Sequence, residues 1–367
     1  MRWALLSGGA VWLAVAGLLS ACAGDGTATP EKRVALAPIS FNEVAGWADE
    51  KHSEALATFR RSCPKLTTGP ETRIATDGGE RTITPAEWKR ICDAGAAIKA
   101  GDNRAARAFF EGNFRPLVVQ TAGKFTGYFE PDMRGSKAPS RLFTVPVYRR
   151  PPDLTDKPYY TRAEIEQGVL KGKGLEIAYV QDPVGLFEVQ VQGSGKIQLA
   201  EGGTMTLGFD GSNNRPYTAI GNVLVEMGVM KKDDVTWPAI RDWLKRNPQQ
   251  ARDVMRKNER YIFFRDTKSQ TAAGAEGVPL TAQRSLAVDT TLTPFGTPVW
   301  IDTVRPVARK PGATEPYRRL MIAQDAGAAI KGPARGDVFF GSGPQAADWA
   351  GRMNSAGRAI VLVPNKS

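Results

Sequence analysis

Residues 321–341 read MIAQDAGAAIKGPARGDVFFG and place two aspartates, Asp325 and Asp337, beside short apolar runs. The apolar residues before Asp325 and the VFF that follows Asp337 have the length and β-favouring composition of buried strands. A carboxylate at the edge of a packed strand costs free energy unless neighbouring groups satisfy it. The stretch therefore predicts two short strands that carry two carboxyl groups for a purpose other than packing.

The last hundred residues predict a small β-barrel. Short apolar runs recur between polar or glycine-bearing turns, in SLAVD, TPVWID, RLMIAQD, GDVFF and AIVLVP. One helix, near PQAADWAGRMN, interrupts them. The 38 glycines and 25 prolines of the whole chain also indicate many turns, as in β-rich architecture.

The region before the barrel strands is predicted to begin with helices. Residues 40–113 have apolar positions at roughly helical spacing, and capping boxes are formed by Ser40 with Glu43 and by Thr84 with Glu87. From residue 117 the period changes, and LVVQ and KFTGYFEP are typical of strands.

A second domain is predicted within residues 136–268, where helical and strand periods alternate. GLFEVQVQGSGKIQL alternates apolar and polar residues and predicts a strand, whereas WPAIRDWLKRNPQQARDVMRK is helical. The expected fold class is mainly β with α. A barrel domain with N-terminal helices is formed by residues 40–135 and 269–367, and a smaller α/β domain is inserted at 136–268.

The N-terminus predicts export and a lipid anchor. Residues 1–21 combine Arg2 with a long apolar stretch, as in a signal peptide. The stretch leads into LSAC at residues 19–22, which resembles a lipobox whose cysteine, Cys22, is acylated; an ordinary signal peptide with a chance cysteine is the alternative. Ala23 after the cysteine favours the outer membrane, and residues 22–39 are expected to be a Thr/Pro/Ala-rich tether.

The net charge limits the classes of molecule that an exported chain is expected to bind. Without residues 1–21 the chain carries 48 basic and 38 acidic residues, a net charge of +10. Outside the cytoplasm nucleic acid is not an expected partner, which leaves phospholipid, lipopolysaccharide or the carboxylate-bearing wall polymer.

Cys63 and Cys92 would form a disulfide in an oxidising compartment or remain as two buried thiols, and the sequence leaves both open.

Several kinds of chemistry are excluded by the residues present. His52 is the one histidine, expected on a solvated helix face, so a Ser-His-Asp triad or a zinc site is not predicted. QGSGK at 192–196 lacks the first glycine and the Ser/Thr of a Walker loop. GSGPQA at 341–346 is expected to be a strand-to-helix turn with Pro344 near the start of the helix. No cofactor and no metal are implied.

Carboxylate and polar side chains remain, and they suit a sugar. FTGYFEP, VQVQGSGK, GSNNRPYTAIG and AVDTTLTPFGTPVW set aromatic rings beside Gln, Asn and Ser, which can stack on a sugar and bind its hydroxyls. With the lipobox, the segments FTGYFEP, VQVQGSGKIQL, YTAIGNVL and AQDAGAAIKG followed by GD resemble the membrane-bound lytic transglycosylase A family from about residue 117 onward.

The resemblance implies a double-psi β-barrel, a smaller inserted domain, and a groove between them for peptidoglycan. It implies cleavage of the bond from N-acetylmuramic acid (MurNAc) to N-acetylglucosamine (GlcNAc) without water, which leaves a 1,6-anhydro ring. Asp337 matches the family's catalytic acid and base, and Asp325 a second aspartate near it; the loop between them is about one residue longer than in the family. Candidate substrate-binding residues are Tyr128, Gln192, Ser194, Tyr217, Asp289 and Lys331.

A water-free cleavage needs one carboxyl group that first donates and then accepts a proton, and burial must raise its pKa. Asp325 would raise the pKa of Asp337 as a like charge or orient its neighbours. Two alternatives remain: a glycan hydrolase, in which Asp325 is the base, and a non-catalytic lipoprotein that binds peptidoglycan. The expected location is the periplasmic face of the outer membrane, with lipid held through Cys22 and the cell-wall synthesis machinery as a possible partner.

Overall fold

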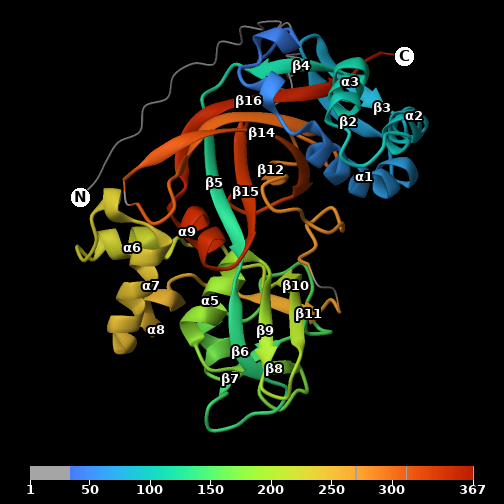
Figure 1. Ribbon diagram of the computed structural model, residues 1–367. Coiled ribbons are helices and arrows are strands. Elements are labelled where there is room, and N and C mark those ends of the chain that lie inside the picture. Colours follow the sequence, from blue (N-terminus) through green and yellow to red (C-terminus); the bar gives the residue numbers. More distant parts are fainter. Residues whose placement is uncertain (1–33, 269–270, 311, 367) are drawn as a thin grey trace, which may run out of the picture. The chain divides into compact units, whose positions relative to one another are not determined.

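The computed structural model describes residues 34–268, 271–310 and 312–366. Two large sheets, a two-stranded hairpin and several helices form the described part of the chain (Figure 1). The predicted fold class, mainly β with α, is confirmed by this arrangement. None of the helices among the described residues combines the length and apolar character needed to cross a bilayer.

Six strands of the eight-stranded sheet close into a ring. The order is β1-β4-β16-β13-β14-β12-β15-β5, and β16 also pairs with β5, which closes the ring from β16 round to β5. The predicted apolar runs supply its core, where Leu286, Met321 and Val338 are buried. The strands are β1 (Leu36–Pro38), β4 (Phe114–Val119), β5 (Gly123–Glu130), β12 (Ser285–Val288), β13 (Pro298–Pro306), β14 (Thr314–Asp325), β15 (Arg335–Ser342) and β16 (Asn354–Pro364).

The one helix predicted among the barrel strands is α9 (Pro344–Arg352), which begins at Pro344 as expected. It packs against β5 where Gly127 has no side chain. A Cβ atom at Gly127 would lie 2.5 Å from the ring of Phe340 and 2.9 Å from the Cα atom of Ala350. The glycine of the FTGYFEP segment therefore lets the helix approach the strand closely.

The N-terminal helices cover one side of the barrel. They are α1 (His52–Thr68), α2 (Pro85–Ala96) and α3 (Asn103–Asn113). The capping box of Thr84 and Glu87 opens α2 as predicted. The box of Ser40 and Glu43 opens only the 3-10 turn η1 (Phe41–Glu43), and η2 (Trp47–Asp49) precedes α1. The hairpin of β2 (Thr72–Thr76) and β3 (Gly79–Ile83) was not predicted.

The prediction that His52 lies on a solvated helix face is wrong. Its side chain is fully buried, with its ring centre 4.5 Å from that of Trp47 and 6.4 Å from that of Phe110. Both ring nitrogens are buried without a hydrogen-bond partner among the described residues. Burial lowers the pKa of His52 to about 4, so the neutral ring acts as an aromatic core residue.

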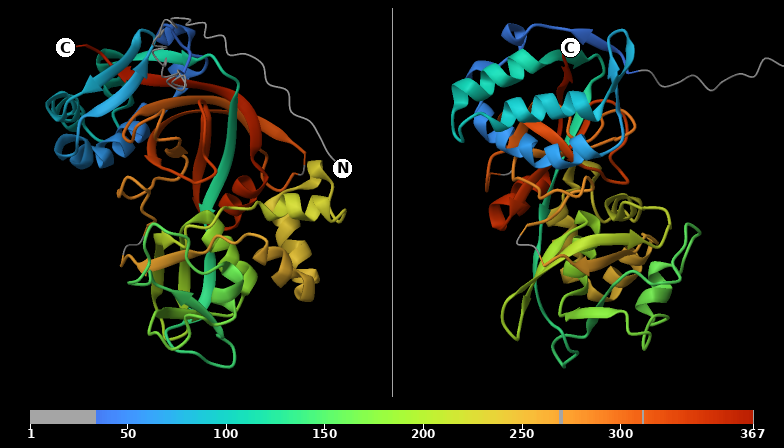
Figure 2. Two further views of the ribbon diagram at one scale, coloured as in Figure 1. Left: turned by 180° about the vertical axis from the view of Figure 1, so that it is seen from behind. Right: turned by 90° about the vertical axis from the view of Figure 1, so that its right-hand side faces the viewer.

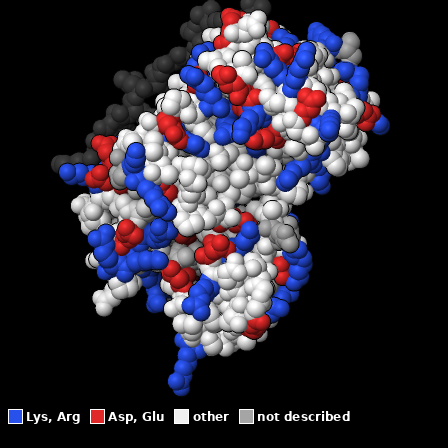
Figure 3. Space-filling view, viewed as in Figure 1, with Lys and Arg blue, Asp and Glu red and all other residues white. Residues whose placement is uncertain are grey.

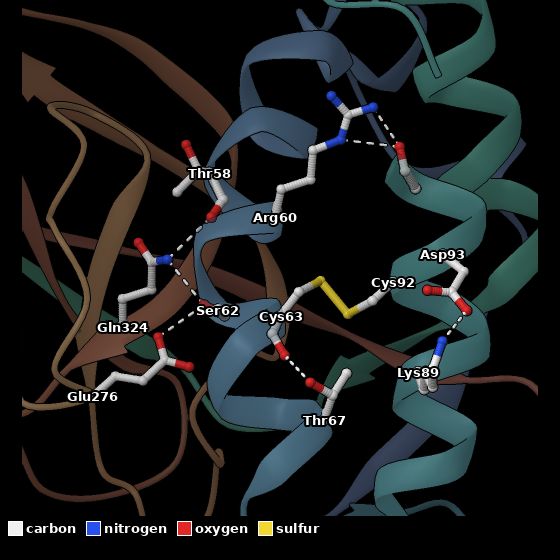
Figure 4. Close-up of a disulfide and its surroundings, with 11 residues drawn as sticks. Thr58, Arg60, Ser62, Cys63, Thr67, Lys89, Cys92, Asp93, Glu276 and Gln324 are labelled. Atoms are coloured by element: carbon white, nitrogen blue, oxygen red, sulfur yellow. Dashed lines mark hydrogen bonds and ion pairs between the residues drawn. A yellow bond between two sulfur atoms is a disulfide. The ribbon is translucent and has the colours of Figure 1, made fainter. Parts of the chain in front are cut away.

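Cys63 of α1 and Cys92 of α2 form a disulfide (Figure 4). Their Cα atoms are 5.8 Å apart, within the usual range for a disulfide. Of the two possibilities that the sequence left open, the structure has the bridge. It joins helices that already pack on each other through a shared apolar core.

A six-stranded sheet forms the second part of the fold, in the order β11-β10-β9-β6-β8-β7. Figure 2 shows β5 leaving the ring and continuing into this sheet as β6, with only Pro131 between them. The strands are β6 (Asp132–Ser136), β7 (Val145–Tyr148), β8 (Glu176–Val180), β9 (Gly195–Leu199), β10 (Thr204–Ser212) and β11 (Ile262–Asp266); the helices are α4 (Arg162–Glu166), α5 (Pro183–Gln192), α6 (Ile220–Glu226), η3 (Lys232–Asp234), α7 (Trp237–Arg246) and α8 (Pro248–Arg256).

The strand predicted for GLFEVQVQGSGKIQL is wrong over its first part. Residues 183–192 form α5, and only Gly195–Leu199 form a strand. The carboxyl group of Asp182 caps the helix by accepting the N–H of Val184, and Pro183 stands at its first position. Because α5 is buried on most sides, apolar residues also fall at alternate positions, which imitates a strand.

Three predictions concern the N-terminal segment and the start of the second sheet. The signal peptide and the acylation site Cys22 lie outside the described residues. The tether expected to run to residue 39 ends earlier, because Leu36–Pro38 form β1 and pair with β4. The second sheet begins at Asp132, four residues before the expected insertion, and the division of the chain into domains stays a prediction.

Candidate active site

Asp325, Ala287, Asp337 and Thr126 stand in one row across four adjacent strands. Ala287 of β12 pairs with Asp325 of β14 on one side and with Asp337 of β15 on the other. Asp337 in turn pairs with Thr126 of β5. Side chains of directly paired residues point to the same face of a sheet. Strands are about 4.8 Å apart, so the two aspartate Cα atoms are roughly 10 Å apart, with the small side chain of Ala287 between them.

The carboxyl group of Asp337 is held by one of its two oxygens. The hydroxyl of Thr126 donates a hydrogen bond of 2.5 Å to Oδ1, and accepts one of 2.8 Å from Nη2 of Arg335. The second oxygen, Oδ2, has no hydrogen-bond partner among the described residues. Burial raises the pKa of Asp337 to about 6; Thr126 and Arg335 oppose the rise, and the charge of Asp325 adds to it. The group is therefore partly protonated near neutral pH.

Asp325 differs because both of its oxygens are occupied. The hydroxyl of Tyr128 donates to Oδ2 at 2.6 Å, and the backbone N–H groups of Ala275 and Ala326 donate to Oδ1 at 2.8 and 2.9 Å. Burial raises its pKa above the ordinary value, while the three donors oppose that rise. Both oxygens of Asp325 therefore already accept hydrogen bonds from the protein, whereas one oxygen of Asp337 does not.

Both carboxyl groups line a cavity of about 300 Å³. One wall comes from the barrel and the loop after Asp325, the other from the inserted sheet and its helices. The lining residues are Gly127, Tyr128, Ala287, Asp325 to Ile330, Arg335 and Asp337 on the barrel side, and Arg162, Gln190 to Gly193, Phe209, Tyr217, Asn258, Arg260 and Ile262 on the other.

A buried arginine organises the second wall. Arg162 donates to Oε1 of Gln190 at 2.6 Å and to the carbonyl oxygens of Asn258 and Arg260 at 2.9 and 2.6 Å. Its guanidinium carbon also lies 4.6 Å from the centre of the Phe187 ring. These contacts fix α5 relative to the segment that leads into β11, and so fix the amide side chains that face the cavity.

Two aromatic side chains stand at this cavity without being buried. Phe209 is 50% exposed and Tyr217 is 41% exposed. Large exposed rings at a polar cavity are suited to stacking on the C–H face of a sugar. They add exposed aromatic surface to a site that also offers hydrogen-bond donors and acceptors.

The structure gathers some of the predicted binding residues at the cavity. Tyr128 and Tyr217 line it, as does Gln192, whose Oε1 accepts the N–H of Phe129 at 3.0 Å. Ser194 is buried before β9 and is not among the lining residues.

Asp289 and Lys331 also lie outside the lining. Asp289 accepts the hydroxyl of Thr291 at 2.8 Å and the N–H of Gly332 at 2.9 Å, and lies 3.6 Å from Nζ of Lys331. These contacts tie the loop after Asp325 to the end of β12.

Four groups at the site were not named from the sequence. Thr126 was within reach, because it lies in FTGYFEP two residues before Tyr128. Arg335 stands two residues before Asp337, a spacing that puts both side chains on one face of a strand. Arg162 and Phe209 carry no signal in the sequence, since only the tertiary fold brings them to the aspartates.

Comparison with known proteins places these features in a family. The chain matches the model described as the MltA specific insert domain over residues 124–265, and the model described as the 3D domain over 284–363. The membrane-bound lytic murein transglycosylase A of Escherichia coli K12 is 35% identical over 282 residues, covering 75% of this chain and 73% of that protein. That of Vibrio cholerae is 34% identical over 240 residues, 65% of this chain and 64% of the relative.

Solved structures of similar proteins match the fold of this chain over most of its length. A membrane-bound lytic murein transglycosylase from Agrobacterium tumefaciens matches with a TM-score of 0.81 at 30% identity, covering 90% of this chain and 98% of that one. E. coli MltA with bound chitohexaose matches with a TM-score of 0.70 at 28% identity, covering 91% and 95%. The chain therefore belongs to the membrane-bound lytic murein transglycosylase A family, whose members are peptidoglycan-degrading enzymes.

Proposed function

We propose that this chain is a lytic transglycosylase that cleaves the β-1,4 bond from MurNAc to GlcNAc in peptidoglycan, with Asp337 as its single acid and base. The observation that carries the assignment is the contrast between the two carboxyl groups. Asp337 has a free oxygen at the cavity and a pKa raised to about 6, whereas Asp325 is bound by donors at both oxygens.

The reaction needs only one such group. Protonated Asp337 gives its proton to the glycosidic oxygen as the bond from C1 of MurNAc breaks, and the GlcNAc end leaves as an alcohol. The resulting carboxylate then takes the proton of the C6 hydroxyl as that oxygen bonds to C1, which closes the 1,6-anhydro ring. No water is consumed, and Asp337 ends protonated as it began.

Burial and the neighbouring charges set the protonation state of Asp337 for the first step. Burial raises the pKa of Asp337 and the charge of Asp325 adds to the rise, so its proton is retained in a pH range where an ordinary aspartate has lost it. Arg335 and Thr126 oppose this rise, and they would stabilise the carboxylate after it has donated. Asp325 thus serves both roles considered from the sequence, as a like charge and as a group that orients Tyr128.

The cavity suits a chain of amino sugars. Gln190 and Gln192 offer amides, Phe209 and Tyr217 offer rings, and the E. coli relative of known structure binds chitohexaose. A net positive charge also suits a wall polymer that bears carboxylates. Figure 3 shows Lys and Arg side chains gathered over the region that holds α6 to α8 in Figure 1.

The hydrolase alternative is disfavoured by the state of Asp325. A hydrolase needs a second carboxylate that activates water or attacks the sugar, and both oxygens of Asp325 are occupied. Mass spectrometry of sacculi digested by the purified protein tests the choice. We expect anhydromuropeptides; products heavier by one water would establish a hydrolase, and intact strands that retain bound protein would establish a binding lipoprotein.

We also propose that the chain is anchored at the periplasmic face of the outer membrane through acylated Cys22, within reach of the cell-wall synthesis machinery. The lipobox supports this, and so do relatives that are named membrane-bound. A fatty-acid probe should label the wild-type protein and not Cys22→Ser. Equal labelling of both would disprove the anchor.

For the domain division we propose that residues 136–268 are inserted into a barrel domain formed by 40–135 and 269–367. The pairing of β15 and β16 with β5 supports it, because β5 precedes the insertion. Residues 269–367 expressed alone should therefore not unfold cooperatively in urea. A cooperative transition would refute the division.

A further inference from the structure

The N–H group that Ala275 gives to Asp325 comes from a tight turn, residues 274–278, laid against the end of β14. The turn closes on itself through two backbone hydrogen bonds, and the N–H of Glu276 donates to the carbonyl oxygen of Gln324 at 3.2 Å. A Cβ atom at Gly274 would lie 2.2 Å from that same carbonyl oxygen. Only glycine permits this approach, so the turn is fitted closely to the residue that precedes Asp325.

Side chains fasten the same turn to α1 in the interior. Oε2 of Glu276 accepts the hydroxyl of Ser62 at 2.7 Å, and the Ser62 oxygen accepts Nε2 of Gln324 at 2.9 Å (Figure 4). Gln324 also donates to the carbonyl oxygen of Thr58 at 3.1 Å and accepts the hydroxyl of Ser285 at 2.6 Å. All five side chains are buried. One network therefore joins α1, β12, β14 and the turn.

A buried carboxyl group at Glu276 costs more free energy than a neutral side chain would if its role were only to hold the turn in place. Its second oxygen, Oε1, is buried without a hydrogen-bond partner among the described residues. Burial raises its pKa to about 7, opposed by the Ser62 hydroxyl and by Lys65, the charged group near it. A buried polar atom without a partner destabilises the folded state. Glu276 therefore lowers the stability of the folded protein, and it directly follows Ala275, whose N–H donates to Asp325.

The disulfide fixes the other end of the network. Cys63 follows Ser62 in α1, and its bond to Cys92 ties this turn of the helix to α2 (Figure 4). Rotation or sliding of α1 would carry the Ser62 hydroxyl away from both of its partners. The disulfide and the buried hydrogen bonds therefore connect α2, through α1, to the turn that donates to Asp325.

We propose that Glu276, Ser62 and Gln324 are positioning residues for the reaction, which keep the N–H of Ala275 on Asp325. They touch neither the cavity nor the substrate. Their effect on the reaction rests on the proposed function, in which the charge of Asp325 adds to the rise in the pKa of Asp337. Without the Ala275 donor the ionised form of Asp325 is less favoured, so a larger fraction of the protein carries a neutral Asp325 that does not raise the pKa of Asp337.

The test compares two substitutions at Glu276 with one at Ser62. Glu276→Ala removes the fastening, Glu276→Gln keeps an oxygen that can accept the Ser62 hydroxyl, and Ser62→Ala breaks the link from the helix side. Thr67→Ala is the matched control, because it removes a hydroxyl bonded to a backbone carbonyl in the same helix, away from the turn. The readouts are kcat, KM and the pH–rate profile on soluble peptidoglycan strands, with Tm measured alongside.

Glu276→Ala and Ser62→Ala should lower kcat by roughly three- to tenfold with KM nearly unchanged, the size of effect expected from one hydrogen bond. The acid limb of the profile should move up by roughly half a unit to one unit, because Asp325 must be ionised in the active pair. Glu276→Gln and Thr67→Ala should keep the wild-type profile.

A fall in Tm with an unmoved profile in Ser62→Ala would overturn the proposal, and so would equal loss in Glu276→Gln and Glu276→Ala. A different result refutes the proposed function itself: wild-type products that contain water, or an active Asp337→Asn. The two failures are therefore distinguishable.

Discussion

Asp337→Asn should abolish the reaction while leaving the fold in place. The Oδ1 atom of an asparagine can still accept the Thr126 hydroxyl, which remains held by Arg335. The amide cannot donate a proton to the glycosidic oxygen or accept one from the C6 hydroxyl. Loss of a single acid and base lowers rates by about 10²–10⁴-fold, and here the two steps share one group, so the upper part of that range is expected.

The same substitution should stabilise the protein at alkaline pH. The pKa of Asp337 is about 6 in the folded state against 3.8 ordinarily. Below 3.8 the carboxyl is protonated in both states and contributes nothing. Between 3.8 and 6 folding holds the proton more tightly than the unfolded chain does, so stability falls as pH rises. A shift of about two units corresponds to about 3 kcal/mol, and solvent at the partly exposed carboxyl reduces this to about 2 kcal/mol.

Two measurements on Asp337→Asn test this reasoning together. Release of anhydromuropeptides from sacculi gives the loss of activity, and urea unfolding at pH 4 and pH 8 gives the stability. We expect equal stability at pH 4 and a gain of about 2 kcal/mol at pH 8. Near-normal turnover would remove Asp337 from its assigned role. An equal effect on stability at both pH values would show that its carboxyl is not perturbed by burial.

Four further sites give independent tests. Cys63→Ser with Cys92→Ser opens a loop of 29 residues and should lower the free energy of unfolding by about 3–4 kcal/mol in urea titration. His52→Phe should flatten the pH dependence of Tm, because His52, with its pKa lowered to about 4, makes the wild type lose up to about 3 kcal/mol as pH falls from 6.5 to 4; an unchanged slope would contradict this. Phe209→Ala should raise KM several-fold with little change in Tm. Asp325→Asn should reduce kcat less than Asp337→Asn and move the alkaline limb of the pH profile to lower pH, since the like charge is gone; an inactive Asp325→Asn would reverse the two roles.

Much of the fold was accessible from local patterns. The barrel strands alternate with turn residues over the last hundred residues, and the helices that begin at Pro85 and Pro344 both have proline at the first position, the former with a capping box as well. Local patterns failed where burial surrounds an element. Residues 183–192 look like a strand because their polar positions are buried too, and the decisive sign was the cap at Asp182. His52 was misplaced because its charged sequence neighbours conceal a side chain turned into the core.

The candidate site was predictable only in part. Asp325 and Asp337 stand out because each carboxylate adjoins a buried strand. Their common row depends on β12 entering between their strands, which no spacing in the chain reveals. The contacts of Arg162 with Gln190 and Asn258 join parts of the chain that tertiary packing alone brings together. Functional residues can be identified from the sequence where a local pattern marks them, and are missed where the fold brings them together from distant segments.

Closure of the ring has a consequence for association. A strand at the edge of a sheet exposes unpaired backbone groups and can recruit a strand from another molecule. In the eight-stranded sheet β5 is paired on both sides, by β15 and β16, so the ring itself has no such edge among the described residues. The sheet extends beyond the ring only through β4 to β1, which is three residues long and ends at Pro38, a residue without an N–H group. The barrel sheet therefore offers little template for strand pairing with another molecule.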